Sequence, residues 1–333
     1  MTLHNYPWLQ SAYHTISEPL MHGRAHHALL VNYVKNSGEN MLINHYVMRL
    51  LCKTPVNQQP CQQCHSCQLF SAQNHPDFYV VEPEQNKLSI GVDQIRAITQ
   101  KVYERSQQGG AKVLWIKTAG KMTEPAANAL LKTLEEPPES TYFILSDQHN
   151  SHLLPTIHSR CAYYFIELPN TEDSINWLKQ SNQLSHHYND NELATALLLN
   201  ENAPFAALML LDAEKWQIRQ EFCHTIHQQF TQHNVWALRD CFIKSENYLE
   251  NMHWFCTLLS DAIKALQKTG RFIINRDQVP LVRLLATYGV DKIIKIYELW
   301  LNARMQLMTV TGLNQELMIS HLLAQTEVIL AFV

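Results

Sequence analysis

Half of the cysteines in this 333-residue chain, four of eight, lie within sixteen consecutive positions. Cys52, Cys61, Cys64 and Cys67 follow the pattern C-x8-C-x2-C-x2-C. A C-x2-C turn directs two thiolates to one point, and four sulfurs suit tetrahedral zinc at about 2.3 Å. Four thiolates would saturate the ion and leave no open position for a reacting molecule. The cluster therefore predicts a structural zinc site.

Other interpretations of the cluster stay open on the residues alone. A ferredoxin-type iron–sulfur run requires a fourth cysteine where Ser71 stands. A redox pair requires only two cysteines, and His65 could replace one thiolate. The single cysteines Cys223, Cys241 and Cys256 lie in helical patterns and are expected to be small packed side chains.

A second pattern with possible chemistry is a phosphate loop that lacks its characteristic residues. The nucleotide-binding pattern is G-x-x-x-x-G-K-[ST], in which backbone and lysine hold the phosphates. With Gly38 as the second glycine, Tyr33 replaces the first glycine, Glu39 the lysine and Asn40 the hydroxyl. A carboxylate repels phosphate, and an aromatic side chain prevents close approach of the backbone. The sequence therefore predicts an empty, degenerate loop with no bound nucleotide.

The acidic motif that should hold magnesium is also missing. After the apolar run 113–116 an Asp-Glu pair is expected, but the chain has Lys117-Thr118. Glycine is scarce as well, with nine in the whole chain, below the roughly 7% that is usual. Two independent losses argue against ATP hydrolysis, so no intrinsic ATPase activity is expected.

The first half of the chain alternates strand and helix patterns. Short runs rich in branched and aromatic residues predict buried strands; they are 28–31, 77–81, 113–116, 142–145 and 162–168. Helical periodicity covers 92–105 and 123–138, where Thr123 can cap the helix start and Pro137-Pro138 end it. Strands separated by helices predict a parallel sheet covered on both faces.

After Pro169 the patterns are helical. Three short helices are expected within 170–213, and longer amphipathic helices follow, including one ended by Gly270. The chain is therefore predicted to have an α/β domain over 1–168, which carries the cysteine loop 52–67. A small helical domain over 169–212 and a larger all-α domain over 213–333 should follow.

Composition limits the function classes. The formal charge is −4, from 26 basic and 30 acidic residues, whereas a broad nucleic-acid-binding face tends to carry a basic excess. The N-terminus has no secretory pattern and no apolar run is long enough for a bilayer, so a cytoplasmic location is expected. Reduced thiols in that compartment favour metal binding over disulfides.

Several longer segments resemble one protein family. They are PWLQ (7–10), HALL (27–30), IGVDQIRAIT (90–99), AANALLKTLEEPPESTYFIL (126–145) and PTIHSRC (155–161). Together with the inserted cysteine cluster, they are similar to the clamp-loader subunits of bacterial DNA polymerase III, in the AAA+ superfamily. The resemblance is strong over 1–168. It implies a RecA-like AAA+ domain, a helical lid domain and a helical collar domain.

The resemblance also implies partners and a site. The expected partners are gamma/tau ATPase subunits and a delta subunit in a five-subunit ring, which places a sliding clamp on primed DNA. In the family's SRC motif, here Ser159, Arg160 and Cys161, the arginine reaches a neighbour's nucleotide. The family's sensing position holds Ser146-Asp147, which suits an empty site. The chain would thus be a non-hydrolysing subunit of a polymerase holoenzyme.

Two alternative functions stay open at this point, an active gamma/tau-like ATPase and a zinc-dependent DNA-binding module. The cysteine cluster contains one basic residue, Lys53, which gives the second alternative little support. In the C-terminal helices, Trp300, Met305 and Met308 could either join the collar contacts or pack in the core.

Overall fold

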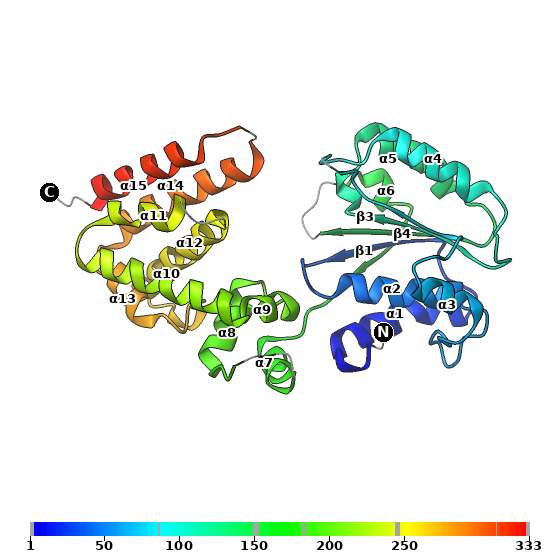
Figure 1. The fold of residues 1–333 in the computed structure, drawn as a ribbon, viewed down its shortest axis with the longest axis horizontal. Coiled ribbons are helices and arrows are strands. Elements are labelled where there is room, and N and C mark those ends of the chain that lie inside the picture. The colour runs from blue at the N-terminus through cyan, green and yellow to red at the C-terminus, as the bar shows by residue number, and fades with distance from the viewer. Residues whose placement is uncertain are drawn as a thin grey trace. The chain divides into compact units, whose positions relative to one another are not determined.

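The computed structural model describes residues 3–85, 87–148, 153–181, 184, 186–243, 247–310 and 312–330. The chain divides into two compact units, Met1–Leu168 and Pro169–Val333. Both are drawn in Figure 1, and we call them the α/β unit and the helical unit.

The α/β unit contains five strands among helices. The strands are β1 (Ala28–Tyr33), β2 (Phe78–Val81), β3 (Lys112–Lys117), β4 (Thr141–Gln148) and β5 (Ala162–Phe165). The α-helices are α1 (Pro7–Met21), α2 (Glu39–Leu51), α3 (His65–Ser71), α4 (Val92–Tyr103), α5 (Glu124–Glu135) and α6 (Pro155–His158). Two short 3-10 helices are η1 (Leu3–Asn5) and η2 (Ala119–Lys121).

All strand pairings in the sheet are parallel, in the order β2-β3-β4-β1-β5. Helices α4, α5 and α6 cover one face, and α1, α2 and α3 cover the other (Figure 1). The central strands are buried on both faces, which accounts for their continuous apolar runs. The predicted α/β fold with helices on both sides of a parallel sheet is confirmed.

Local sequence signals place the ends of these elements. The Thr123 side chain accepts a hydrogen bond from the Ala126 N–H at the start of α5, as predicted. Helix α5 ends at Glu135, shortly before Pro137-Pro138. Strand β5 ends at Phe165, earlier than the predicted 168, although the Ile166 N–H still donates to the Asn32 carbonyl.

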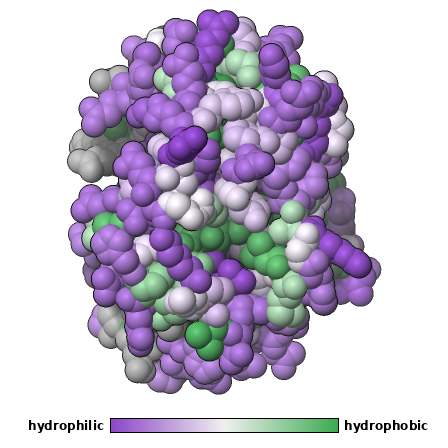
Figure 2. Space-filling view, turned by 90° about the vertical axis from the view of Figure 1, so that its right-hand side faces the viewer, coloured by the Kyte–Doolittle hydropathy of each residue, from purple (hydrophilic) through white to green (hydrophobic). Residues whose placement is uncertain are grey.

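The face of the α/β unit that Figure 2 shows is mostly polar. Figure 2 looks at the molecule from the side of this unit; hydrophilic residues cover most of that face, and hydrophobic ones gather in a band across its middle. Leu88, 79% exposed, is the most exposed of the large apolar side chains described in this unit. Most of the other apolar side chains pack between the sheet and the two layers of helices that cover it.

The described part of the helical unit contains no strand, as predicted. Its α-helices are α7 (Thr171–Gln180), α8 (Asp190–Leu199), α9 (Pro204–Leu210), α10 (Ala213–Thr231), α11 (Arg239–Ile243), α12 (Tyr248–Leu266), α13 (Val279–Ala286), α14 (Val290–Thr309) and α15 (Gln315–Leu330). Short 3-10 helices are η3 (Val235–Leu238) and η4 (Gly270–Phe272).

One apolar core runs through the helical unit, from Leu178 in α7 to Leu330 in α15. Trp300 is fully buried in it, with its ring centroid 4.7 Å from Phe242 and 4.8 Å from Phe255. Trp300 is therefore a core residue. The separate lid (169–212) and collar (213–333) stay a prediction.

A buried polar network fixes the loop before α13 to this core. Arg219, fully buried in α10, donates to Asn275 at 2.8 Å and forms an ion pair with Asp277 at 2.5 Å. The Asp261 carboxylate accepts from the backbone N–H groups of Ile274 and Asn275. Each buried charge thus has a partner, as burial requires.

One predicted helix end is wrong. Helix α12 ends at Leu266, because Lys268 adopts a left-handed backbone (φ 58°) and the Thr269 N–H closes onto the Lys264 carbonyl. Gly270 instead begins η4. Within the residues described, no single helix is long and apolar enough to cross a bilayer; only the bent pair α8–α9, broken by 115°, meets both criteria together.

Candidate functional site

The phosphate loop, residues 34–38, connects β1 to α2. Tyr33 is the last residue of β1, and Glu39 is the first residue of α2. Gly38 precedes the helix with φ 97°, and Asn36 also has a left-handed backbone with φ 60°. The chain thus keeps the strand–loop–helix geometry of a nucleotide site, with different side chains at its key positions.

Side chains of the protein itself occupy the start of α2. Glu39 is 8% exposed, and its carboxylate accepts from the Ser37 hydroxyl at 3.4 Å and from the Asn40 amide at 3.3 Å. The Trp8 indole N–H donates to the Ser37 carbonyl at 2.9 Å. Burial raises the pKa of Glu39, although nearby N–H and O–H donors partly oppose the rise.

The neighbouring strand end is also acidic and internally bonded. Ser146 accepts the buried Trp115 indole N–H at 2.9 Å, so it is engaged in the core. Asp147 is 3% exposed and lies in register with Asn32 of β1. Burial, followed by the charges of Glu39 and Asp147, raises the pKa of Tyr33 to about 12. Two carboxylates therefore contribute negative potential beside Tyr33, where a nucleotide site requires cations.

The end of β3 likewise lacks magnesium ligands. Lys117 lies there, 3.4 Å from a Glu82 carboxylate oxygen and 4.9 Å from the centre of the Trp115 ring. Thr118 follows with a left-handed backbone, φ 51°. Lys117 and Thr118 thus stand where the acidic pair is expected, and the Lys117 ammonium group pairs with the nearby Glu82 carboxylate.

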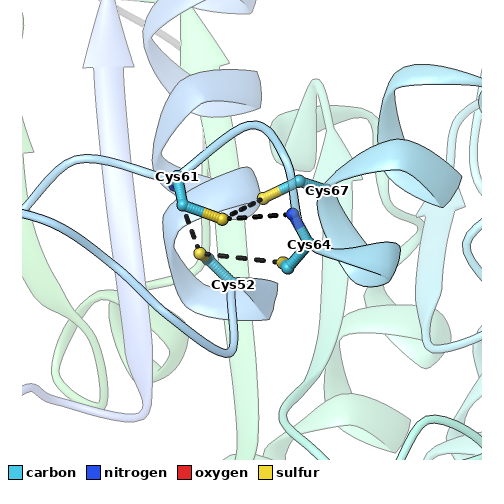
Figure 3. Close-up of side chains that lie close together, drawn as sticks. All are labelled: Cys52, Cys61, Cys64 and Cys67. Atoms are coloured by element: carbon cyan, nitrogen blue, oxygen red, sulfur yellow. Dashed lines mark hydrogen bonds between the residues drawn. The ribbon is translucent and has the colours of Figure 1, made fainter.

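The four predicted cysteines converge in the cysteine loop, residues 52–67 (Figure 3). Cys52 follows the last residue of α2, as predicted, and Cys67 lies in α3. The Cys52 and Cys64 sulfurs are 4.0 Å apart, as are those of Cys61 and Cys67. All four sulfurs lie within 4.8 Å of one another, so the cluster could hold a metal ion.

The donor set fits a tetrahedral metal. Sulfurs about 2.3 Å from a tetrahedral zinc ion are roughly 3.8 Å apart, slightly closer than these. The Cys61 N–H donates to the Cys52 sulfur, and the Cys64 N–H to the Cys61 sulfur, both at 3.3 Å. Such N–H donors favour thiolates and orient them toward an ion.

The thiols of the cluster differ in acidity. Hydrogen bonds from the Thr54 hydroxyl and from backbone N–H groups lower the pKa of Cys61 to about 5. Burial raises the pKa of Cys52 and of Cys67. Because metal ligands must be thiolates, binding would displace protons chiefly from the two buried thiols.

Hydrogen bonds attach the cysteine loop to the rest of the unit. The Tyr13 hydroxyl of α1 donates to the Gln58 carbonyl, and His45 of α2 lies 2.6 Å from the Gln59 side-chain oxygen. The Lys53 ammonium donates to the carbonyl of Gln108. The loop is thus fixed to two helices and to the segment before β3.

A buried Ser–His–Asp series beside the cysteines is structural. Ser66 lies 2.6 Å from the His75 Nε2 atom, which resembles a hydrolase pair. However, the Ser66 hydroxyl donates to the Leu51 carbonyl, and the Asp77 backbone N–H donates to His75 Nδ1. His75 therefore has no acceptor nitrogen left for the serine proton, and the series connects α3 to β2.

Arg160 lies in the turn between α6 and β5. Its Nε donates to a Glu135 carboxylate oxygen at 2.7 Å, and its Nη2 lies 2.5 Å from the same oxygen. Its Nη1 donates to the Thr156 carbonyl at 3.0 Å and contacts the Ser159 hydroxyl at 3.3 Å. The Arg160 side chain is 34% exposed, so the guanidinium is held and still reaches solvent. We call Glu135, Thr156, Ser159 and Arg160 the arginine site.

The remaining SRC residues have structural surroundings. The Ser159 hydroxyl donates to the Thr156 carbonyl, and Cys161 packs against the core of the α/β unit. Burial raises the pKa of Cys161 to about 12, so it is a thiol at neutral pH. Arg160 is thus the charged member of the motif, and its side chain is 34% exposed.

Three residues with clear roles were missed in the sequence. Trp8 bonds the phosphate loop, Thr54 donates to the Cys61 sulfur at 3.3 Å, and Glu135 binds Arg160. A signal existed for Glu135: two carboxylates end a helix where the helix dipole disfavours anions. The contacts of Trp8 and Thr54 depend on tertiary structure and leave no local pattern.

Comparisons with known proteins agree on one family. A family model described as DNA polymerase III, delta subunit, matches residues 8–170, and one described as its C-terminal part matches 213–327. The chain is 38% identical to DNA polymerase III subunit delta′ of Yersinia pestis, over 98% of this chain and 96% of that one. It is 36% identical to the Escherichia coli K12 subunit delta′, over 97% and 95%.

A solved structure from Thermotoga maritima also matches the chain. It is a protein related to the gamma subunit of DNA polymerase III, with 19% sequence identity and a TM-score of 0.49. The match covers 97% of this chain and 99% of that one.

Proposed function

The chain belongs to the delta-prime subunits of the DNA polymerase III clamp loader, and on that basis we propose that it donates Arg160 to a neighbour's ATP without hydrolysing ATP itself. In this proposal the receiving site belongs to a gamma/tau subunit. The chain contributes the cation, while its own phosphate loop stays empty.

The phosphate loop supports the first half of the proposal. Glu39 is buried at the position of the phosphate-binding lysine, and Asp147 adds a second carboxylate nearby. A triphosphate carries several negative charges and would need cations or N–H donors here. Binding would therefore require the buried carboxylate of Glu39 to be neutralised.

The arginine site supports the second half. A guanidinium is permanently charged and its planar N–H groups match phosphate oxygens. Arg160 is partly exposed on the outside of the sheet domain, and Glu135 and Thr156 restrict its orientation. An arginine supplied from a neighbour stabilises charge that develops on a transferring phosphoryl group.

We assign the metal of the cysteine loop as structural zinc. Cys52, Cys61, Cys64 and Cys67 would hold it, which leaves no position for substrate. Bound zinc would supply a cross-link among the end of α2, the loop and α3. No reaction step passes through it.

The proposed assembly is a five-subunit ring of this chain with gamma/tau subunits and a delta subunit, which loads a sliding clamp on primed DNA. The collar would lie in 213–333 and the lid in 169–212. Met305 and Met308 of α14 are 55% and 59% exposed, which suits side chains that become buried between collar helices of adjacent subunits.

One observation carries the proposal: the chain buries a carboxylate where a nucleotide needs a cation, and exposes a cation elsewhere. The test replaces Arg160 by Ala and by Lys in the reconstituted clamp loader and measures steady-state ATP hydrolysis. Alanine should remove an effect of about 10³–10⁵ at the receiving site. Lysine should restore little, because it lacks the planar fork.

The matched control is Arg24→Ala, an exposed arginine in the turn after α1. It should assemble and hydrolyse ATP like the parent. Unchanged hydrolysis with Arg160→Ala, in a complex that still assembles, would refute the donated arginine. Separately, equilibrium binding of labelled ATP to the isolated chain should be absent at micromolar concentrations; measurable binding would refute the empty phosphate loop.

A further inference from the structure

We propose that Glu135 is a positioning residue for Arg160, which holds the guanidinium in the orientation needed to meet a neighbour's phosphate. This inference rests on the proposed function of Arg160. It assigns a role to a carboxylate that lies 25 positions away in the chain, at the end of α5.

The contacts define how the guanidinium is held. One Glu135 oxygen accepts from Nε at 2.7 Å and lies 2.5 Å from Nη2, while the Thr156 carbonyl accepts from Nη1 at 3.0 Å. These two partners come from different elements, α5 and α6, so they restrict both the position and the plane of the group. The described residues place no further acceptor at Nη2, so that nitrogen keeps donor capacity for an oxyanion.

The location of Glu135 is costly for the helix. Glu135 and Glu136 stand at the C-terminal end of α5, where unpaired carbonyl groups carry partial negative charge. Carboxylates are unfavourable there, whereas the positively charged Arg160 is favourable. The Glu135 carboxylate is unfavourable for its own helix end but contacts Arg160. Its position is therefore explained better by the contact with Arg160 than by the stability of α5.

The strength of the contact also suits positioning. The two side chains are 34% and 49% exposed, so water screens the pair and it adds little to folding stability. A weak, directional contact can orient the guanidinium before assembly and adjust when phosphate arrives. Glu135 itself does not touch the reacting atoms, and its effect passes through Arg160.

The experiment compares Glu135→Ala with Glu136→Ala in the reconstituted clamp loader, with sliding clamp and primed DNA present. Glu136 is the matched control, since it is the adjacent exposed carboxylate at the same helix end and the structure shows no contact from it to Arg160. Glu135→Ala should lower kcat for ATP about two- to fivefold with KM unchanged, the range that a screened ion pair can hold. Glu136→Ala should leave both unchanged.

A double-mutant cycle separates positioning from a structural contribution. In the Arg160→Ala background, Glu135→Ala should have no further effect on kcat, because its partner is already absent. Thermal unfolding of the isolated chain should change little with Glu135→Ala, since alanine suits this helix end. A fall in kcat that follows a large loss of folding stability would instead assign Glu135 a structural role and overturn the proposal.

The outcomes also distinguish this inference from the proposed function. If Arg160→Ala lowers hydrolysis but Glu135→Ala does not, or if their effects add, the positioning role is wrong and the donated arginine stands. An increased rate with Glu135→Ala would show that the carboxylate competes with phosphate, and would also overturn positioning. If Arg160→Ala itself has no effect, both fail together.

Discussion

A loop with the pattern of a ligand-binding site lies at each end of helix α2, and the two loops are stabilised in different ways. The phosphate loop, before Glu39, is held by protein groups: the Trp8 indole bonds the Ser37 carbonyl, and Ser37 bonds Glu39. The cysteine loop, after Leu51, brings four sulfurs within 4.8 Å of one another. The phosphate loop thus has contacts with protein groups, and the cysteine loop has four potential metal ligands close together.

The difference predicts that the two ends of α2 respond to different changes. A metal ion held by the four cysteines would cross-link the cysteine loop, so we expect that loop to lose order when the metal is removed. The phosphate loop needs no ion, because its polar groups have protein partners. Removing the metal should therefore affect one end of α2, and removing Trp8 should affect the other.

The largest expected effect is that of Cys64→Ser. It removes one of four ligands, so zinc should be lost together with several kcal/mol of metal-linked folding energy in the loop. Elemental analysis should fall from about one zinc per chain to near none. Hydrogen exchange should accelerate over 52–67 and stay unchanged over 34–38.

The control for that change is Cys241→Ser, a partly buried cysteine in α11 of the helical unit. It should retain the parent's zinc content. Full zinc content in Cys64→Ser would contradict the four-thiolate site, and faster exchange at 34–38 would show that the two loops are not independent.

The second prediction concerns the phosphate loop. Trp8→Ala removes a buried ring and the bond to Ser37. It should cost about 3–5 kcal/mol in urea unfolding, as for other large-to-small changes in a core. Hydrogen exchange should accelerate over 34–40, while zinc content stays at the parent's level.

Trp8→Phe distinguishes the packing of the ring from the hydrogen bond of its N–H group. It keeps most of the packing and should cost about 1 kcal/mol, the net value of one hydrogen bond, plus a small volume term. If Trp8→Phe and Trp8→Ala destabilise equally, the bond to Ser37 and not the packing holds the loop. Loss of zinc in either variant would contradict the separation of the two ends.

These regions also show what the sequence could and could not predict. The cysteine site was predictable in full, because its ligands are close in sequence and their spacing reflects the geometry of the metal. For the phosphate loop, Tyr33 and Glu39 at the positions of the first glycine and the lysine predict that no nucleotide binds, and this stays a prediction. The replacement contact was not predictable, since Trp8 is 29 positions from Ser37 and a lone tryptophan has no characteristic spacing.

The arginine site falls between these two cases. Arg160 could be found through a resemblance in SRC, and not from physical chemistry alone, because a single arginine has no pattern. Its partner Glu135 belongs to another element, 25 positions earlier. Local patterns predicted the strands, most helices and the cap at Thr123, but not the end of α12, and pairs between distant elements required the structure.

The third prediction is a pH dependence in the phosphate loop. The pKa of Glu39 is raised above its ordinary value, chiefly by burial. Between the ordinary and the raised pKa the folded state therefore binds more protons than the unfolded state, and stability falls as pH rises through that window. Glu39→Gln removes the ionisation and should stabilise the chain at pH 7 by about 1–3 kcal/mol.

The gain should shrink toward pH 4, where the carboxyl group is mostly protonated in both states. Glu18→Gln, an exposed glutamate on α1, is the control and should change stability little at either pH. Urea unfolding at both pH values measures the difference. A Glu39→Gln variant that is less stable than the parent at pH 7 would show that the N–H donors at the start of α2 outweigh burial.

The smallest expected effect tests the helix that contacts both loops. Helix α1 bonds the phosphate loop through Trp8 and the cysteine loop through the Tyr13 hydroxyl, which donates to the Gln58 carbonyl. Tyr13→Phe keeps the ring against His45 and should cost about 1 kcal/mol, because it removes one hydrogen bond. Exchange should accelerate over 56–62 and not over 34–40, since the metal and Trp8 hold their loops separately. If both segments loosen together, α1 couples the two ends of α2, and the independence of the two loops is wrong.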